Sequence, residues 1–232
     1  NAAILLLGKA ESEHFISPAI ARITWILRAT NNIEKDYTHF GMPLLLATEQ
    51  VFAKIRNLTY RYIRDGGLFP EEIDQYDPYV IRESLNNCIA HQDYTLRGKI
   101  IVVENEDATL TFVNSGEFIP QTIRHVIDND APERYYRNQF LADAMVTLKM
   151  IDTIGSGIKR MFMIQRERFF PLPDYDFSEQ KVKVTITGKV LNVEYARKLA
   201  QTPNLLLSDI ILLDRMQKQQ MLTDDEITQL RK

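Results

Sequence analysis

The chain has 232 residues, 45% of them hydrophobic and 25% charged, a composition typical of a globular protein that buries a core. Its net charge of -3 and pI near 5.9 exclude a generally basic surface, so any contact with nucleic acid must be local. A single cysteine, Cys88, excludes an internal disulfide and a multi-cysteine zinc site. We expect a cytoplasmic protein without a membrane span, and the start at Asn1 indicates a fragment whose first domain precedes it.

The first half of the chain predicts two strands and two helices. Residues 2–7 form a continuous apolar run and residues 20–28 alternate, so both are predicted to be strands. Residues 43–63 carry apolar side chains at helical spacing without glycine or internal proline, which predicts a helix. A loop with two prolines follows, and the sequence RESLNNCIAHQDY belongs to a second predicted helix at 79–91.

The second half predicts a hairpin, a long loop and mainly helices. Residues 99–104 and 108–113 are β-branched runs joined by a polar turn, as in a hairpin. Residues 117–136 are rich in turn formers and charges, which predicts a loop with one short helix, and loops of that length are often lids. The remaining elements are helices at 138–151 and 155–169, a strand at 181–187, and, after Gly188, helices only.

These elements predict an α+β fold. The expected mixed sheet contains the runs at 2–7, 20–28, 99–104, 108–113 and 181–187, with the helix at 79–91 against one face. The helical tail after residue 190 is expected to make few contacts with the sheet.

One stripe of the helix at 79–91 carries a carboxylate, an amide and an imidazole at four-residue intervals: Glu83, Asn87 and His91. At helical spacing these three share one face, and the apolar residues around Ile81 and Leu85 share another. The stripe is either a solvated face or the wall of a ligand site. In a site, Glu could accept a proton, Asn could hold a metal and His could donate to an anion. The helix alone leaves both interpretations open.

Two glycine segments favour a ligand site. Gly116 follows a predicted strand, where the backbone can approach a planar ligand closely. Gly155 and Gly157 lead into a helix whose first-turn amides attract an anion, with Lys159 close behind. Tight turns would use the same glycines, so the alternative of purely structural glycines stays open.

The order of these features resembles the GHKL nucleotide-binding fold shared by gyrase, MutL and histidine kinases. The stretches IRESLNNCIAHQDY, LTFVNSGEF and YRNQFLADAMVTLKMIDTIGSGIKRM are similar to the GHKL-type domain of bacterial proteins described as RecG-related ATP-dependent helicases or transcriptional regulators. The opening NAAILLLGKAE is similar to the end of the AlbA-type (Schlafen-like) DNA-binding domain that precedes it in that family. The resemblance implies three parts: residues 1–40 end a preceding AlbA-like domain or link to it, 41–188 form the GHKL-type ATP-binding-like domain, and 189–232 form the tail.

The resemblance also implies site residues and cofactors. Glu83 matches the catalytic general base, and Asn87 matches the ligand of magnesium. ATP and magnesium are the implied cofactors. The implied nucleotide-binding residues are Asn87, His91, Asp93, Asn114, Gly116, Gly155, Ser156, Gly157 and Lys159. These residues are expected to face one concavity.

The sequence departs from the family pattern in the first glycine box. Asn114 stands where an aspartate accepts from the adenine amino group, and an amide adds a donor there. Phe118 stands where a second glycine is expected. These changes predict a weak ATPase at most. The sequence contains no G-x-x-x-x-G-K-[ST] phosphate loop, so this chain does not encode a conventional helicase motor.

The tail resembles the opening of a winged-helix module. Thr223 lies three residues before Glu226, a capping-box spacing that predicts a helix start, and the chain stops at Lys232 before any wing. Two helices that simply pack on the domain are the alternative.

Two functions follow from these observations. The first is a DNA-binding transcriptional regulator whose GHKL-type domain binds ATP or a related ligand. We expect the flanking modules to bind the DNA and the chain to form a homodimer. The alternative is a nucleotide-free GHKL-like scaffold for dimerisation or protein interaction.

Overall fold

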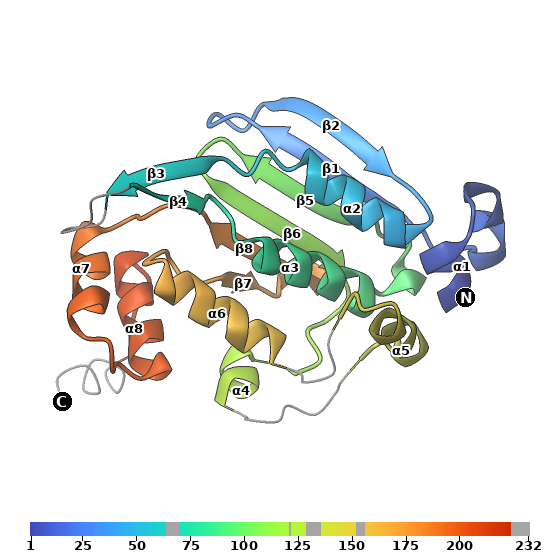
Figure 1. Cartoon of the computed structure of the whole chain (residues 1–232). Coiled ribbons are helices and arrows are strands. Elements are labelled where there is room, and N and C mark those ends of the chain that lie inside the picture. Colours follow the sequence, from blue (N-terminus) through green and yellow to red (C-terminus); the bar gives the residue numbers. More distant parts are fainter. Residues whose placement is uncertain (64–69, 121, 129–135, 152–155, 224–232) are drawn as a thin grey trace.

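A computed structural model describes residues 1–232 apart from 64–69, 121, 129–135, 152–155 and 224–232. Its centre is a six-stranded sheet with the strand order β2-β1-β5-β6-β8-β7, and a separate two-stranded sheet is formed by β3 and β4 (Figure 1). The strands are β1 (Ile23–Arg28), β2 (Glu34–Phe40), β3 (Thr59–Ile63), β4 (Pro70–Asp74), β5 (Ile100–Asn105), β6 (Thr109–Ser115), β7 (Asp174–Asp176) and β8 (Lys181–Thr187).

The large sheet is mixed. β1 runs parallel to β5, whereas the other neighbouring strands are antiparallel. The predicted α+β class is therefore confirmed, as are the strands expected near 20–28, 99–104, 108–113 and 181–187. β2 and β7 were not predicted. β2 is an edge strand with largely exposed polar side chains, and β7 has only three residues, so neither carries a readable alternation.

Helices cover one face of the sheet, with α3 between α2 and α6 (Figure 1). α3 begins after Asp77, whose side chain accepts a hydrogen bond from the Tyr79 amide, with Pro78 in the first turn. The helices are α1 (Ala2–Leu7), α2 (Leu44–Lys54), α3 (Pro78–His91), α4 (Ile123–Asp128), α5 (Gln139–Thr147), α6 (Gly157–Glu167), α7 (Val193–Gln201) and α8 (Leu207–Gln217), with 3-10 turns at Ala10–Ile16, Tyr94–Leu96 and Ser178–Gln180.

Three predictions of local structure were wrong. One is the loop with two prolines, which contains the strand β4 (Pro70–Asp74) and the first residues of α3. Residues 2–7 form the helix α1 instead of a strand, because a short unbroken apolar run of alanine and leucine has no period that distinguishes the two states. Leu5 and Leu6 of α1 are buried in the core. The helix predicted over 43–63 ends at Lys54, and residues 59–63 pair with β4 as a hairpin. The residues TYRYI have a high strand propensity. Together with their pairing to β4, this makes the segment extended instead of helical.

The first forty residues share the sheet with the rest of the chain. β1 lies between β2 and β5 and is hydrogen bonded to both. The predicted division at residue 41 therefore runs through a single sheet, and the strands at 23–40 belong to the same layer as β5, β6 and β8.

The chain has two apolar clusters. The larger one fills the space between the sheet and α2 and α3, with Trp25, Leu85 and Phe112 fully buried. The second cluster joins the tail helices α7 and α8 to α4 and α6. Its buried members are Ile127, Phe162, Leu172, Tyr195, Leu199 and Ile210.

The tail is also fastened by polar contacts. Asp214 of α8 is buried and accepts hydrogen bonds from the Leu172 amide at 2.9 Å and from Gln217 Nε2 at 2.6 Å. Lys218 forms an ion pair with Asp214. The tail thus packs on the helical layer, and its cluster contains none of the central strands. Glu226, the second residue of the predicted capping box, lies outside the described residues. None of the helices in the described residues is both long and apolar enough to cross a membrane.

Candidate functional site

The two faces of α3 differ as the sequence predicts. Its apolar side is buried on the sheet, and Leu85 is only 2% exposed. Glu83, Asn87 and His91 are all partly exposed on the other side. The structure therefore places the polar stripe away from the main core.

Glu83 lies directly against the start of α6. A Cβ atom added to Gly157 would stand 1.7 Å from Glu83 Oε1 and 2.4 Å from Cδ, so this position admits only glycine while the carboxylate is there. Ser156, the N-cap residue of α6, makes no capping hydrogen bond through its side chain within the described part of the chain. The Glu83 carboxylate therefore lies at the N-terminal end of α6, where the helix dipole favours negative charge.

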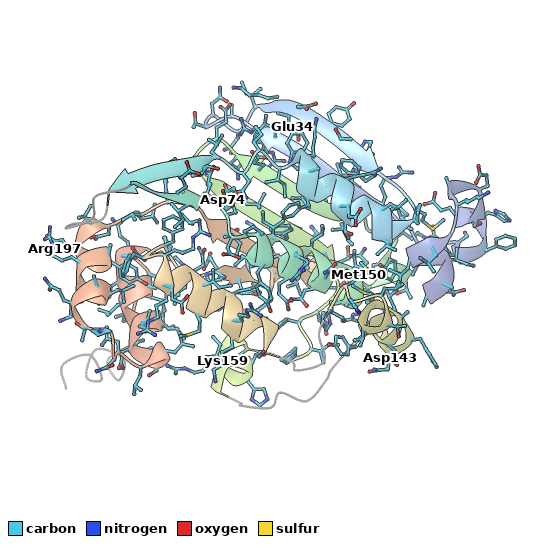
Figure 2. The ribbon with its side chains drawn as sticks, in the orientation of Figure 1. Glu34, Asp74, Asp143, Met150, Lys159 and Arg197 are labelled. Carbon is cyan, nitrogen blue, oxygen red and sulfur yellow. The ribbon has the colours of Figure 1, made fainter. Side chains whose placement is uncertain are left out.

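Asn87 is joined to this carboxylate. Its Nδ2 donates to Glu83 Oε1 at 3.1 Å, one helical turn away. Because the nitrogen points to Glu83, the carbonyl oxygen of Asn87 is the atom that can meet a cation. Lys159 lies in the first turn of α6, near α4 (Figure 2). Gly155 lies outside the described residues.

Asn114 faces the helical layer from the sheet. In the register of β6, β8 and β7, Phe112, Val184 and Tyr175 form one row across the strands. Asn114 lies two residues further along β6, opposite Val182, so its side chain shares the face of buried Phe112. Asn114 is 3% exposed, and its Nδ2 donates to the Ser115 carbonyl at 3.2 Å. The amide is thus positioned in the layer between sheet and helices.

His91, Asp93 and Gly116 gather at a different point, the carboxyl end of α3. Arg137 Nη1 pairs with Asp93 Oδ2 at 3.2 Å, and the His91 ring stacks on Tyr136 with centroids 5.4 Å apart. Gly116 has φ of +115°, and a Cβ there would lie 3.1 Å from Arg137 Nε and from Asp93 Cβ. These residues hold the end of the 117–136 loop against α3, and we call them the α3 clamp.

Two further residues of this joint were not predicted. Asn138 Nδ2 donates to the carbonyls of Ala90 at 3.0 Å and Gln92 at 2.8 Å, which satisfies orphan groups at the end of α3. The buried Gln92 side chain accepts from the Ser115 amide at 2.8 Å and donates to the Gly98 carbonyl at 2.7 Å. The HQDY sequence already contained Gln92, but only the folded chain brings Asn138 to it.

His91 makes the folded state sensitive to acid. Burial, followed by the charge of Arg137, lowers the pKa of His91 from 6.5 to about 4. The neutral ring is therefore favoured in the folded state. The stabilisation is present in full above pH 6.5 and is lost as the pH falls from 6.5 towards 4, because the unfolded chain takes up the proton first. We expect a loss of about 1–3 kcal/mol across this window.

The measurement is urea unfolding at pH 7 and pH 4.5 for the wild type and His91→Gln. The loss of unfolding free energy between pH 7 and pH 4.5 should be smaller in His91→Gln than in the wild type, by most of the expected difference of about 1–3 kcal/mol. Replacing the exposed His14 with Gln is the matched control and should leave the dependence as in the wild type. An unchanged slope in His91→Gln would contradict the assignment.

The described residues contain no group of three or more His, Cys, Asp or Glu side chains that could hold a metal ion. Magnesium fits such a site, because it commonly takes one or two protein ligands together with substrate phosphates and water. Glu83 and Asn87 are the side chains that could supply them.

Comparison with known families gives a match over part of the chain. Residues 98–186 match the family described as "Putative ATP-dependent DNA helicase recG C-terminal". The matched residues include β5 to β7, β8 up to Ile186, and α4 to α6, and α3 with Glu83 and Asn87 precedes them. This part of the chain is therefore similar to an ATPase-like family described as RecG-related.

A solved structure agrees with the fold. The crystal structure of the DIP2311 protein from Corynebacterium diphtheriae is similar, with a TM-score of 0.70 and 18% sequence identity. The similarity covers 91% of this chain and 43% of DIP2311, so this chain spans less than half the length of that protein. No curated protein matches the sequence.

Proposed function

We propose, from the premise that residues 98–186 are similar to this RecG-related family, that this chain is the nucleotide-responsive part of a DNA-associated transcriptional regulator. Magnesium with ATP or a related nucleotide would bind between α3, the start of α6 and the end of β6. The observation that carries the proposal is the Glu83 carboxylate against Gly157, with the Asn87 amide bonded to it. This contact brings together a candidate general base, Glu83, a candidate cation ligand, Asn87, and a candidate phosphate site at the start of α6.

Charge supports a cation as part of the ligand. The start of α6 favours an anion, and a phosphate placed there would meet the negative charge of Glu83. A magnesium ion between them would remove the repulsion, and Asn87 offers its carbonyl oxygen for that ion. Glu83 would then be placed to accept a proton from an attacking water. Asn114 stands where a carboxylate would accept from the adenine amino group. This substitution is consistent with nucleotide binding and with a weak ATPase activity at most.

The second apolar cluster supports the proposal that a conformational change on nucleotide binding reaches the flanking modules. α4 belongs to the 117–136 loop and α6 begins at Gly157, and both share that cluster with the tail helices. A ligand that shifts α4 or α6 would therefore change the packing of the tail, and contacts to DNA through flanking modules would respond.

Replacing Asn87 with Ala should abolish stabilisation by nucleotide and leave the unliganded fold nearly unchanged, because this partly exposed amide contributes little to the core. A ligand that binds only the folded state at 100 times its dissociation constant adds about 2.7 kcal/mol. We expect thermal unfolding with Mg-ATP to report that gain for the wild type and none for Asn87→Ala.

The control is Gln139→Ala, which removes an exposed amide from α5 and should keep the full gain. Mg-AMP tests whether the phosphates beyond the first contribute to binding at the start of α6. Equal stabilisation of wild type and Asn87→Ala by Mg-ATP would contradict the role of Asn87.

A nucleotide-free scaffold is the second candidate function. It is favoured by the buried Asn114 amide, which already donates to the carbonyl of its own strand neighbour. Such a scaffold would use the sheet and helices for dimerisation or protein contact. Sedimentation over a range of concentrations checks it, with a dimer whose formation does not depend on Mg-ATP as the expected result.

A further inference from the structure

Four aromatic side chains meet beside the candidate site. Phe118 follows β6, Phe162 lies on α6, Tyr175 lies on β7 and Phe177 follows β7. The rings of Phe118 and Phe177 are stacked, with centroids 4.5 Å apart and planes 9° apart. The Tyr175 ring is 6.4 Å from Phe118, 6.0 Å from Phe177 and 6.4 Å from Phe162. We call Phe118, Tyr175 and Phe177, with Phe162 behind them, the aromatic plug.

The plug lies on the helix-covered face of the sheet. Tyr175 is opposite Val184 and in the same row as Phe112, one row from Asn114 and Val182. Tyr175 also packs against both apolar clusters, so it lies where the sheet core and the tail cluster meet. Burial raises the pKa of Tyr175, and the charge of Glu83 raises it further, which agrees with a phenol close to that carboxylate.

The rings leave no gap for a nucleotide base. Stacked aromatic rings have centroids about 4.5 Å apart at the closest, so inserting a base between Phe118 and Phe177 would need about twice that spacing. The observed distance is 4.5 Å. Tyr175 lies one row from Asn114 on the same face of the sheet, so the plug fills space beside Asn114, where the proposed function places the base.

Two rings of the plug belong to a part of the sheet that can separate at small cost: Tyr175 lies on β7 and Phe177 follows it, whereas Phe118 follows the inner strand β6. β7 is an edge strand of three residues that pairs only with β8 among the described strands. Phe118, Tyr175 and Phe177 are partly exposed, whereas Phe162 is 4% exposed. Withdrawal of β7 would break few ladder hydrogen bonds and would leave Phe162 in place.

We propose that the aromatic plug is an autoinhibitory contact that occupies the place of the nucleotide base, and that Tyr175 and Phe177 must withdraw with β7 before Mg-ATP binds. This inference rests on the proposed function and adds its regulation. The apparent dissociation constant then equals the intrinsic one divided by the fraction of molecules with the plug withdrawn. With an open fraction of about 1–10%, removing the plug should tighten binding about 10- to 100-fold.

The experiment is titration calorimetry of Mg-ATP into the wild type, Phe118→Ala and Tyr175→Ala, with folding checked by circular dichroism. Both variants are expected to bind about 10- to 100-fold more tightly than the wild type. Tyr175→Phe retains the ring and should bind within about twofold of the wild type, since the ring fills the space. Phe140→Ala removes an aromatic ring that is 87% exposed on α5 and is the matched control. Phe118→Leu replaces Phe118→Ala if the latter does not fold.

The outcomes separate the two proposals. Tighter binding in the plug variants supports both, and if the wild type shows no binding, the Asn87→Ala comparison is made in the Phe118→Ala background. Equal affinity in wild type and folded plug variants overturns the autoinhibitory contact and leaves the proposed function standing. Weaker binding in Phe118→Ala also overturns the contact, because the rings would then be a platform for the base. No heat in any folded variant overturns nucleotide binding itself.

Discussion

Replacing Leu85 with Ala is expected to cost about 2–5 kcal/mol of unfolding free energy, the range measured for large-to-small substitutions at buried leucines. Leu85 is 2% exposed and belongs to the large apolar cluster between α3 and the sheet. Alanine retains helix propensity, so the loss comes from burial and from the cavity left behind. Urea unfolding of both proteins measures it.

The control is Leu46→Ala on α2, where the leucine is 51% exposed. The same chemical change there should alter stability by about 0.5 kcal/mol or less. A cost below 1 kcal/mol for Leu85→Ala, with the control unchanged, would mean that α3 does not pack on the sheet through this face.

Replacing Arg56 with Ala is expected to destabilise the fold by about 3 kcal/mol, because it leaves a buried carboxylate without its cation. Glu104 on β5 is 3% exposed, and its oxygens accept from Arg56 Nε at 2.6 Å and from Trp25 Nε1 at 3.1 Å. The Arg56 side chain is 42% exposed, so solvent screens part of the loss and keeps it at the lower end of the range for broken buried pairs.

Arg28→Ala provides the comparison. Arg28 pairs at 3.4 Å with Glu34, whose side chain is 54% exposed, so no buried carboxylate is left behind and this loss should be below about 1 kcal/mol. The double variant Arg56→Ala with Glu104→Gln should regain part of the stability, because the remaining buried group is then uncharged. No recovery of stability in the double variant would show that Arg56 stabilises the fold through packing of its aliphatic carbons.

The local patterns that predicted structure correctly were those that carry a clear period. The α3 region carries a clear period, with one apolar face of buried residues, and the Asp77 cap and Pro78 at its start are added by the structure. The hairpin of β5 and β6 follows from two β-branched runs and a polar turn. For segments without a clear hydrophobic period, contacts with neighbouring elements determine the secondary structure. α1 is helical beside α5, and β3 is extended because β4 pairs with it.

The candidate site was predictable in part. The spacing of Glu83 and Asn87 on one helix face is a local property, and so is the start of a helix after the glycine segment that contains Gly157. Their contact is a tertiary property, because it depends on how α3 and α6 pack. The proposed roles of His91, Asp93 and Gly116 at a nucleotide remain predictions, and the structure gives all three a place in the α3 clamp.

The sequence by itself determined which faces of the helices and strands are apolar, because periods of 3.6 and 2.0 fix side-chain direction within one element. It therefore determined that α3 covers the sheet through Leu85 and presents Glu83 and Asn87 on its other side. Only the tertiary structure decided what meets that side. Phe118 and Tyr175 are separated by more than fifty residues in the sequence, and no local period relates them to Glu83. Their meeting follows from β6, β8 and β7 lying side by side, since strand pairing is a choice between distant segments.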